Sequence, residues 1–309
     1  MRLLLLFIFS VYSNSLLAQK SIYKYRNSSD STYNAYALLL PEDGEIEGLI
    51  IRDYSNLPDF SKKSPYQWSK IALEYKMAIL ITQTSNIFPE LYYSEDGPSL
   101  LVEIVHEVVM EYGIPSNNLF IGGMSSSGTR ALRYVQFCEK GKSKYGTKIK
   151  AAFAVDSPLD LERFYYSASR NKQYMKGGML WEATLICDVF PKILGTVPSI
   201  DHEIYQSSSV YSYMDPEGSN AKWLQNTPIL FFHEPDMDWW MNERGATYYD
   251  INSFDIIGLV NYLRILGNNQ IELVCTHQKG YDREGNRNCH SWAIVDENYL
   301  IDWIVKQLN

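Results

Sequence analysis

The fold is decided by the stretch Asn118-Leu119-Phe120-Ile121-Gly122-Gly123-Met124-Ser125-Ser126-Ser127-Gly128-Thr129-Arg130-Ala131-Leu132. The apolar run at 118–121 predicts a buried strand, and a helical pattern follows over 126–137. The residues at the junction are small, which a chain needs where a strand reverses sharply into a helix. Such a turn leaves the residue at its tip in a strained backbone with its side chain exposed, and here that residue is Ser125.

This junction resembles the nucleophile elbow of the α/β-hydrolase superfamily, whose motif is G-x-S-x-G. Gly123 stands two residues before Ser125, as the motif requires, but Ser127 occupies the last position and Gly128 follows one residue later. The resemblance implies that Ser125 is a nucleophile. Ser126 is the alternative, although Met124 precedes it by two residues. An ordinary Gly/Ser-rich turn has the same composition, so the rest of the chain must decide.

The composition is that of a globular protein. The chain has 309 residues, of which 46% are hydrophobic and 21% charged, enough for one large α/β domain or two small ones. Its net charge of -8, with acidic residues spread along the chain, argues against a nucleic-acid-binding surface, which needs a basic patch. The 24 tyrosines suit sugar or aryl binding and ordinary packing alike.

Residues 1–19 have the pattern of a secretory signal peptide. Arg2 precedes an apolar run at 3–11 that is too short to span a membrane, and small or polar residues lead to Ala18 and Gln19. We expect cleavage there, a folded domain over 20–309, no membrane span in the mature chain, and a periplasmic or secreted location.

Apolar runs alternate with helical patterns along the rest of the chain. Continuous runs of this kind are typical of parallel strands buried on both faces of a sheet. Strands are expected at 36–40, 48–52, 77–82, 118–121, 151–155, 228–232 and 271–276, and helices at 99–112, 126–137, 253–266 and 291–308. For the first helix, Ser99 is the expected N-cap and Gly113 the terminating residue. The predicted fold is α/β, with a mostly parallel sheet between helices on both faces.

The regular spacing of strands breaks once, over about 70 residues between 155 and 228. Helical patterns at 159–170 and 178–194 favour a helical cap insertion, at about 158–226, over the carboxyl edge of the sheet. Aromatic residues of the cap and of the segment after the next strand are candidates for the pocket wall, unless they form the cap's own core: Phe164, Tyr165, Tyr166, Trp181, Trp239 and Trp240.

The superfamily places its triad in the chain order serine, acid, histidine, with the acid after a late strand. The loop His233-Glu234-Pro235-Asp236-Met237-Asp238 follows the predicted strand at 228–232, so the resemblance implies that Asp236 is the acid. Asp238 is the first alternative and Glu234 the second.

The resemblance also implies that the base lies between the last strand and the final helix. His290 stands in that place, and His277 is the alternative. For the oxyanion hole, the resemblance implies the N–H of Ser126 and a donor after the strand at 48–52. Tyr54, through its N–H or hydroxyl, or the N–H of Ser55 could supply the second donor.

The four cysteines include no C-x-x-C pair and histidines are few, so no metal site or cofactor is indicated. Export permits disulfides, and a Cys275–Cys289 bridge would close a loop of about 15 residues and anchor His290. Four free thiols are the alternative.

Together these features predict an exported carboxylesterase that forms an acyl-enzyme through Ser125, His290 and Asp236. Its substrate would be a small-molecule or glycan-linked ester. An acyltransferase or serine peptidase would use the same triad. A different class of protein, an inactive hydrolase fold that binds glycans or partners, remains open because the elbow and the oxyanion loop depart from the usual motifs.

Overall fold

The computed structural model describes residues 21–27, 29–42, 44–59 and 67–308, so the predicted signal peptide lies outside the described residues. Within them, eight strands form one sheet with the order β1-β2-β4-β3-β5-β6-β7-β8. Their bounds are β1 Ser21–Tyr25, β2 Ala35–Leu39, β3 Gly48–Asp53, β4 Met77–Gln83, β5 Leu119–Met124, β6 Ala151–Val155, β7 Ile229–His233 and β8 Ile271–Cys275.

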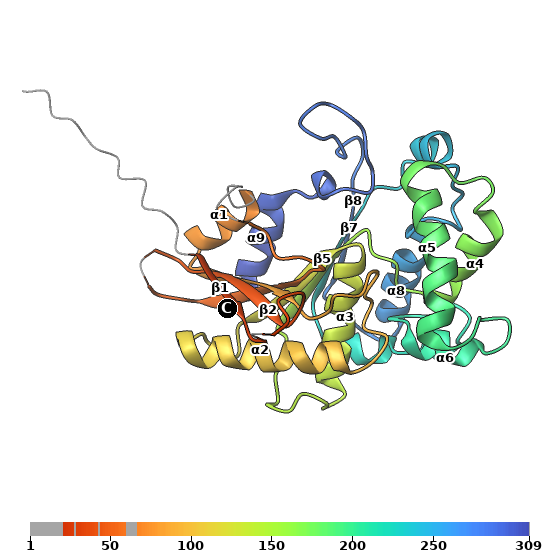
Figure 1. Ribbon diagram of the computed structural model, residues 1–309. Coiled ribbons are helices and arrows are strands. Elements are labelled where there is room, and N and C mark those ends of the chain that lie inside the picture. The colour runs from red at the N-terminus through yellow and green to blue at the C-terminus, as the bar shows by residue number, and fades with distance from the viewer. Residues whose placement is uncertain (1–20, 28, 43, 60–66, 309) are drawn as a thin grey trace, which may run out of the picture.

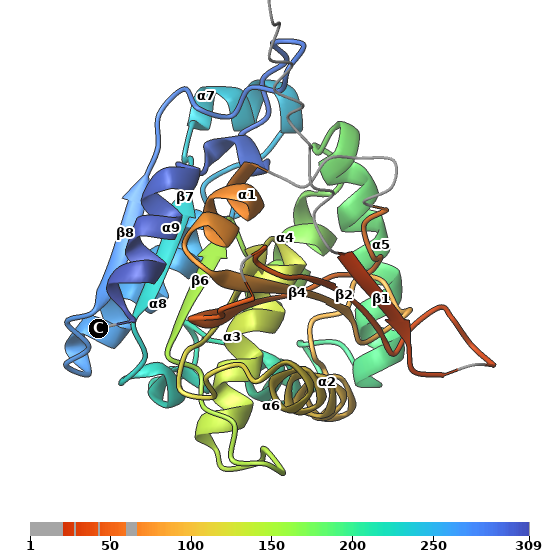
Figure 2. The same ribbon diagram turned by 90° about the vertical axis from the view of Figure 1, so that its left-hand side faces the viewer.

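Strands β3 to β8 run parallel, whereas β1 and β2 are antiparallel to their neighbours. Figure 2 shows β1 at one edge of the sheet and β8 at the other. The predicted seven strands correspond to β2 to β8, and β1 was not predicted. It is mostly exposed along its length, so it lacks the continuous apolar run that marks the buried strands.

Helices cover both faces of the sheet (Figure 1). Helices α1 (Gln67–Glu74) and α9 (Glu297–Lys306) pack on one face, and α2 (Asp96–Tyr112), α3 (Ser126–Glu139) and α8 (Ser253–Ile265) pack on the other. Helix α2 begins one turn before the expected Ser99 and ends at Gly113, whose φ of 65° is left-handed as expected. Helix α9 starts later than predicted, because Asp296 caps it and the short 3₁₀ turn η3 (Trp292–Ile294) comes first. No helix of the described residues is long and apolar enough to cross a membrane.

Between β6 and β7 the chain builds a cap from α4 (Leu161–Asn171), α5 (Gly177–Leu194), α6 (His202–Ser208) and the 3₁₀ turn η1 (Ala221–Leu224). After β7, α7 (Met237–Trp239) and the π-helical turn η2 (Trp240–Arg244) continue this layer. Figure 1 shows α4, α5 and α6 grouped at one side of the sheet. The cap has its own apolar core, in which Phe164, Phe190 and Tyr205 pack together.

A buried ion pair joins the cap to the helix layer below it. Arg163 of α4 donates from Nε to Asp255 Oδ1 of α8 at 2.8 Å, and both side chains are buried. Asp255 also accepts the backbone N–H groups of Leu159 and Asp160 at 2.9 and 3.1 Å. Because both oxygens of this carboxylate accept hydrogen bonds from the segment that starts the cap, the pair fixes where the cap begins relative to α8.

We therefore expect Arg163→Met to lower the free energy of unfolding by about 3–5 kcal/mol, since it leaves Asp255 buried without a counter-charge. Urea denaturation measures this loss. Lys192→Met is the matched control, because Lys192 pairs with Asp188 on an exposed helix surface and should cost less than about 1 kcal/mol. Equal small losses in the two variants would show that the buried pair does not hold the cap.

Candidate active site

Ser125 lies at the sharp turn between β5 and α3. Its φ of 54° and ψ of -129° form a strained backbone for a residue with a side chain, and its N–H donates to Val155 O at 2.8 Å. A Cβ added at Gly123 would lie 2.2 Å from Ser127 Oγ, and one at Gly128 would lie 2.1 Å from Ser157 Oγ. The elbow thus needs glycine at 123 and at 128.

Ser127 explains the departure from the usual motif. Its hydroxyl is buried and donates to the carbonyl oxygen of Asp53, at the end of β3, at 2.6 Å. Arg130 donates to the same carbonyl oxygen at 2.8 Å, and its Nη1 lies 3.0 Å from the Asp53 carboxylate. A glycine at 127 would lose one of these contacts between α3 and the loop after β3.

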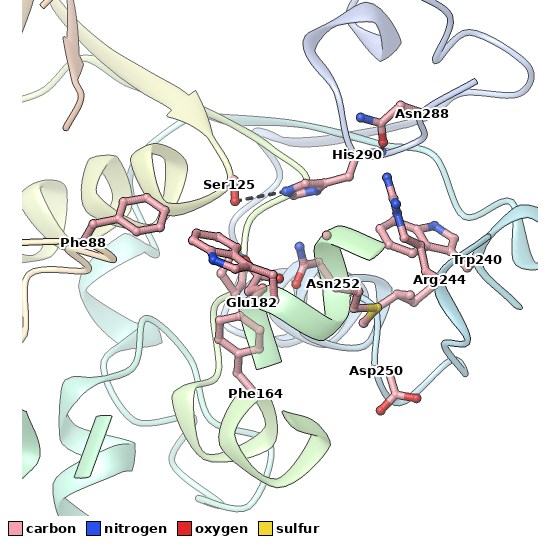
Figure 3. Close-up of a pocket in the computed structure, with 15 residues that line it drawn as sticks. Phe88, Ser125, Phe164, Glu182, Trp240, Arg244, Asp250, Asn252, Asn288 and His290 are labelled. Atoms are coloured by element: carbon pink, nitrogen blue, oxygen red, sulfur yellow. Dashed lines mark hydrogen bonds between the residues drawn. The ribbon is translucent and has the colours of Figure 1, made fainter. Parts of the chain in front are cut away.

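A hydrogen-bonded chain of three side chains starts at Ser125, and Figure 3 shows its first contact, between Ser125 and His290. His290 Nε2 lies 3.1 Å from Ser125 Oγ, and His290 Nδ1 lies 2.5 Å from Asp156 Oδ2. With the Nδ1–H donating to Asp156, Nε2 is left to accept the Ser125 hydroxyl proton. The structure brings Ser125 and His290 together, but the carboxylate behind the histidine is Asp156, not the predicted Asp236.

Asp156 directly follows β6, the strand next to β5, and is completely buried. It also contacts a second imidazole: His233, the last residue of β7, lies with Nδ1 2.8 Å from Asp156 Oδ1, and its Nε2 hydrogen-bonds to the Ser253 hydroxyl. Burial alone would raise the pKa of Asp156, but the adjacent His290 and His233 hold that pKa well below the usual range of an aspartate. Asp156 therefore remains ionised between two imidazoles.

His290 responds to the same pairing. Burial lowers the pKa of its imidazole and Asp156 raises it, with the result that the pKa of His290 lies above its ordinary value of 6.5. The negative charge of Asp156 thus stabilises the protonated imidazole that forms when His290 accepts a proton.

The predicted acid and its alternatives have other partners. Asp236 caps α7 by accepting the N–H of Trp239 at 3.1 Å, and it lies 2.6 Å from Arg287. Glu234 is buried and pairs with Arg287 at 2.5 Å, while Asp238 is exposed. In the described part of the chain none of the three contacts His290. The sequence does contain a signal for Asp156, since it follows the predicted strand at 151–155 as Asp236 follows the next one.

Glu234, Asp236 and Cys289 also lie close enough together to suggest a metal site. The guanidinium of Arg287 already contacts both carboxylates and neutralises their charge. Arg287 thus takes the role that a metal cation would have there. This ion-pair cluster holds the loop before His290 against the end of β7.

The expected Cys275–Cys289 disulfide is wrong: all four cysteines are free thiols. Cys275 is exposed at the end of β8, whereas Cys289 is buried with the cap core and its Sγ lies 3.7 Å from Glu234. The loop between β8 and His290 is held instead by the ion pairs of Arg287 with Glu234 and Asp236. His277, the alternative base, is exposed in the same loop and does not reach Ser125.

Three aromatic rings surround the guanidinium of Arg52 close to the site. The Arg52 guanidinium lies 4.2 Å from the ring centroid of Trp292, two residues after His290, and 4.9 Å from that of Trp68. It also lies 4.7 Å from the Tyr54 ring. Arg52 is buried, and cation–π contacts are stronger away from water. These contacts therefore hold the loop that carries His290 against β3.

The two predicted oxyanion donors differ in availability. Tyr54 donates its N–H to Thr82 O at 2.9 Å, so that amide is not free to bind a substrate. Ser126 is the first residue of α3, where helix geometry leaves the N–H without a partner in the helix. The Ser126 N–H therefore points out at the start of the helix beside Ser125.

Ser125 and His290 open into a cavity of about 290 Å³ beneath the cap (Figure 3). Residues from the cap, from η2 and from several loops line it, among them Phe88, Phe164, Met179, Trp181, Glu182, Trp240, Arg244, Asn252 and Asn288. Phe164, Trp181 and Trp240 were among the expected pocket aromatics. Trp239, by contrast, is buried behind the wall under Arg244, and Tyr165 and Tyr166 pack against each other within the cap.

Comparison with known proteins gives structural matches only. No protein-family model and no curated protein sequence matches the chain. A truncated carbohydrate esterase from gut microbiota superimposes with a TM-score of 0.58 at 12% identity, covering 94% of this chain and 96% of that one. S-formylglutathione hydrolase from Staphylococcus aureus superimposes with a TM-score of 0.52 at 14% identity, covering 94% and 99%.

An acylaminoacyl peptidase from Pyrococcus horikoshii matches with a TM-score of 0.53 at 11% identity, over 89% of this chain. The chain spans only 39% of that longer protein. At these identities the matches establish the arrangement of strands and helices. The predicted fold is confirmed: the chain has the α/β-hydrolase fold.

Proposed function

We propose that this protein is a serine hydrolase that cleaves esters, with Ser125 as nucleophile, His290 as general base and Asp156 as the residue that orients His290. The observation that carries the proposal is the chain of hydrogen bonds from Ser125 through His290 to Asp156, at the floor of a cavity large enough for a substrate.

The geometry supports a two-step acyl transfer. Ser125 Oγ attacks the ester carbonyl carbon while His290 Nε2 takes the hydroxyl proton, and the protonated imidazole then gives this proton to the leaving alkoxide. Water, deprotonated by His290, attacks the resulting acyl-enzyme and releases the carboxylic acid and free Ser125. Asp156 stays ionised throughout and stabilises the imidazolium in both steps.

The oxyanion of each tetrahedral intermediate needs N–H donors beside Ser125. The Ser126 N–H at the start of α3 is the first donor we assign. With the Tyr54 amide bonded to Thr82, the next amide of the loop, that of Ser55, is the second. Ser127 and Arg130 support this assignment because they tie Asp53, two residues before Ser55, to α3.

We propose small-molecule or glycan-linked esters as substrates. The basic start and apolar run at 1–19 support export to the periplasm or beyond. An acyltransferase or a peptidase would form the same acyl-enzyme and differ in the acceptor or the bond cleaved. The Ser125–His290 contact favours an active enzyme over an inactive binding fold.

Ser125→Ala should abolish labelling by a fluorophosphonate probe and reduce kcat for an aryl acetate by about 10⁶-fold, because the nucleophile is lost. Gel fluorescence and ester hydrolysis measure the two effects. Ser126→Ala is the control, since its backbone N–H is retained and its hydroxyl has no role in the proposed mechanism. Labelling that persists in Ser125→Ala would mean that another residue is the nucleophile.

Asp156→Asn should reduce kcat by about 10⁴-fold, since an amide can hold His290 in the wrong tautomer and cannot stabilise the imidazolium. Asp236→Asn should stay within about tenfold of the wild type, because Asp236 contacts Arg287 and the start of α7. Steady-state kinetics on the same aryl acetate compare the two variants. The assignment of the acid fails if Asp236→Asn is the crippled enzyme.

A further inference from the structure

Glu182 is a carboxylate in the wall of the proposed catalytic cavity that the mechanism does not use. It lies on α5 of the cap and shares the cavity with Ser125 and His290 (Figure 3). Its neighbour Ala183 turns into the cap core, whereas the half-buried Glu182 side chain faces the cavity.

Glu182 also lacks a partner. Within the described residues no hydrogen bond or ion pair involves its side chain, whereas Asp250, another acid of this cavity, accepts hydrogen bonds from Ser167, Asn171 and Thr247. Burial raises the pKa of Glu182, and the charges of His290 and Arg163 offset this effect only in part. A cation bound in the cavity would reduce the remaining cost of an ionised carboxylate.

The surrounding wall is aromatic. Phe88, Phe164, Trp181 and Trp240 line the same cavity, and the rings of Phe88 and Trp181 stack with centroids 5.9 Å apart. The faces of aromatic rings attract cations, and ammonium groups bind where several such rings meet. A carboxylate among aromatic rings is therefore suited to an organic cation.

Besides His290, Arg244 is the lining residue that would favour an anion. Its guanidinium lies over the Trp239 ring, 4.8 Å from the centroid, and forms no ion pair with Glu182. In Figure 3 Arg244 lies beside Trp240, whereas Glu182 lies on the side of Phe164. Arg244 thus already has an aromatic partner, whereas Glu182 has no hydrogen-bond or ion-pair partner in the part of the chain that the structure describes.

We propose that the cavity selects esters that carry an ammonium group, with Glu182 as the counter-charge and the rings of Trp181 and Phe164 around the cation. This inference rests on the proposed function, because it names the substrate class of that site. Glu182 is then a specificity-determining residue on the cap. The cap binds the ammonium group of the substrate, whereas Ser125 and Asp156, at the ends of sheet strands, take part in the cleavage of the ester.

The test compares matched acetate esters. The acetate of choline is paired with 3,3-dimethylbutyl acetate, which has the same shape without charge, and 4-aminobutyl acetate is paired with pentyl acetate. We expect kcat/KM to be about 10- to 100-fold higher for at least one cationic ester than for its neutral partner, as for a charged interaction out of bulk water. In Glu182→Gln that ratio should fall to near one.

Glu203→Gln is the matched control, since Glu203 is an exposed acid elsewhere in the cap and its loss should leave the ratio unchanged. Equal rates for both pairs in the wild type, or a ratio that survives Glu182→Gln, would overturn the inference. A preference for the acetate of 4-hydroxybutanoate that disappears in Arg244→Gln would overturn it in favour of an anion site.

Direct binding separates this inference from the proposed function. Calorimetry should detect tetramethylammonium or butylammonium binding to the wild type and about tenfold weaker binding to Glu182→Gln, without any turnover. Binding without fluorophosphonate labelling would contradict the hydrolase and keep the cation site. Labelling without binding of either cation would keep the hydrolase and contradict the cation site.

Discussion

The site depends on one carboxylate shared by two imidazoles. Asp156 has no exposed surface, and each of its oxygens contacts a histidine: Oδ2 faces His290 and Oδ1 faces His233. A buried charge is stable only when its partners are fixed, and here the partners come from two separate segments, the end of β7 and the loop after β8. The carboxyl ends of β5, β6 and β7 are thereby joined to the loop before α9.

His233 gives this arrangement its rigidity. Its ring is completely buried, and the Ser253 hydroxyl at the start of α8 holds the nitrogen that does not face Asp156. Asp156 is thus prevented from rotating away from His290, and the Ser125 hydroxyl meets an imidazole of defined tautomer. The Arg52 stack on Trp292 and the Arg287 pair with Glu234 hold the histidine loop from either side. Small displacements of a catalytic group are costly in rate, which is why a long loop needs such anchors.

The parts of the site that follow from local chemistry were predictable from the sequence. The small residues around Ser125 predicted the sharp strand-to-helix turn, because only small residues fit there. A Cβ at Gly123 or at Gly128 would clash with a serine hydroxyl. The buried strands were predictable because a parallel sheet requires continuous apolar runs. The exposed edge strand β1 has no such run and was missed.

The acid was not predictable because two adjacent strands, β6 and β7, each end in a loop with an aspartate. Which carboxylate meets His290 depends on how the histidine loop crosses the sheet, and that is a tertiary property. Asp236 also carries a local signal of another kind, since it stands three residues before the Trp239 amide that it caps. The anchoring of the loop was expected from Cys289, but it comes from Arg287, because ion pairs leave no spacing pattern of the kind that cysteines do.

The most direct test of this account is the titration of His290, followed by NMR of protein labelled with ¹⁵N-histidine and assigned with His290→Gln. The pKa of His290 should lie above 6.5 in the wild type and fall in Asp156→Asn, because the neutral amide no longer stabilises the imidazolium. It should stay unchanged in Asp236→Asn. A His290 pKa that falls in Asp236→Asn and not in Asp156→Asn would contradict the shared carboxylate on which the site is built.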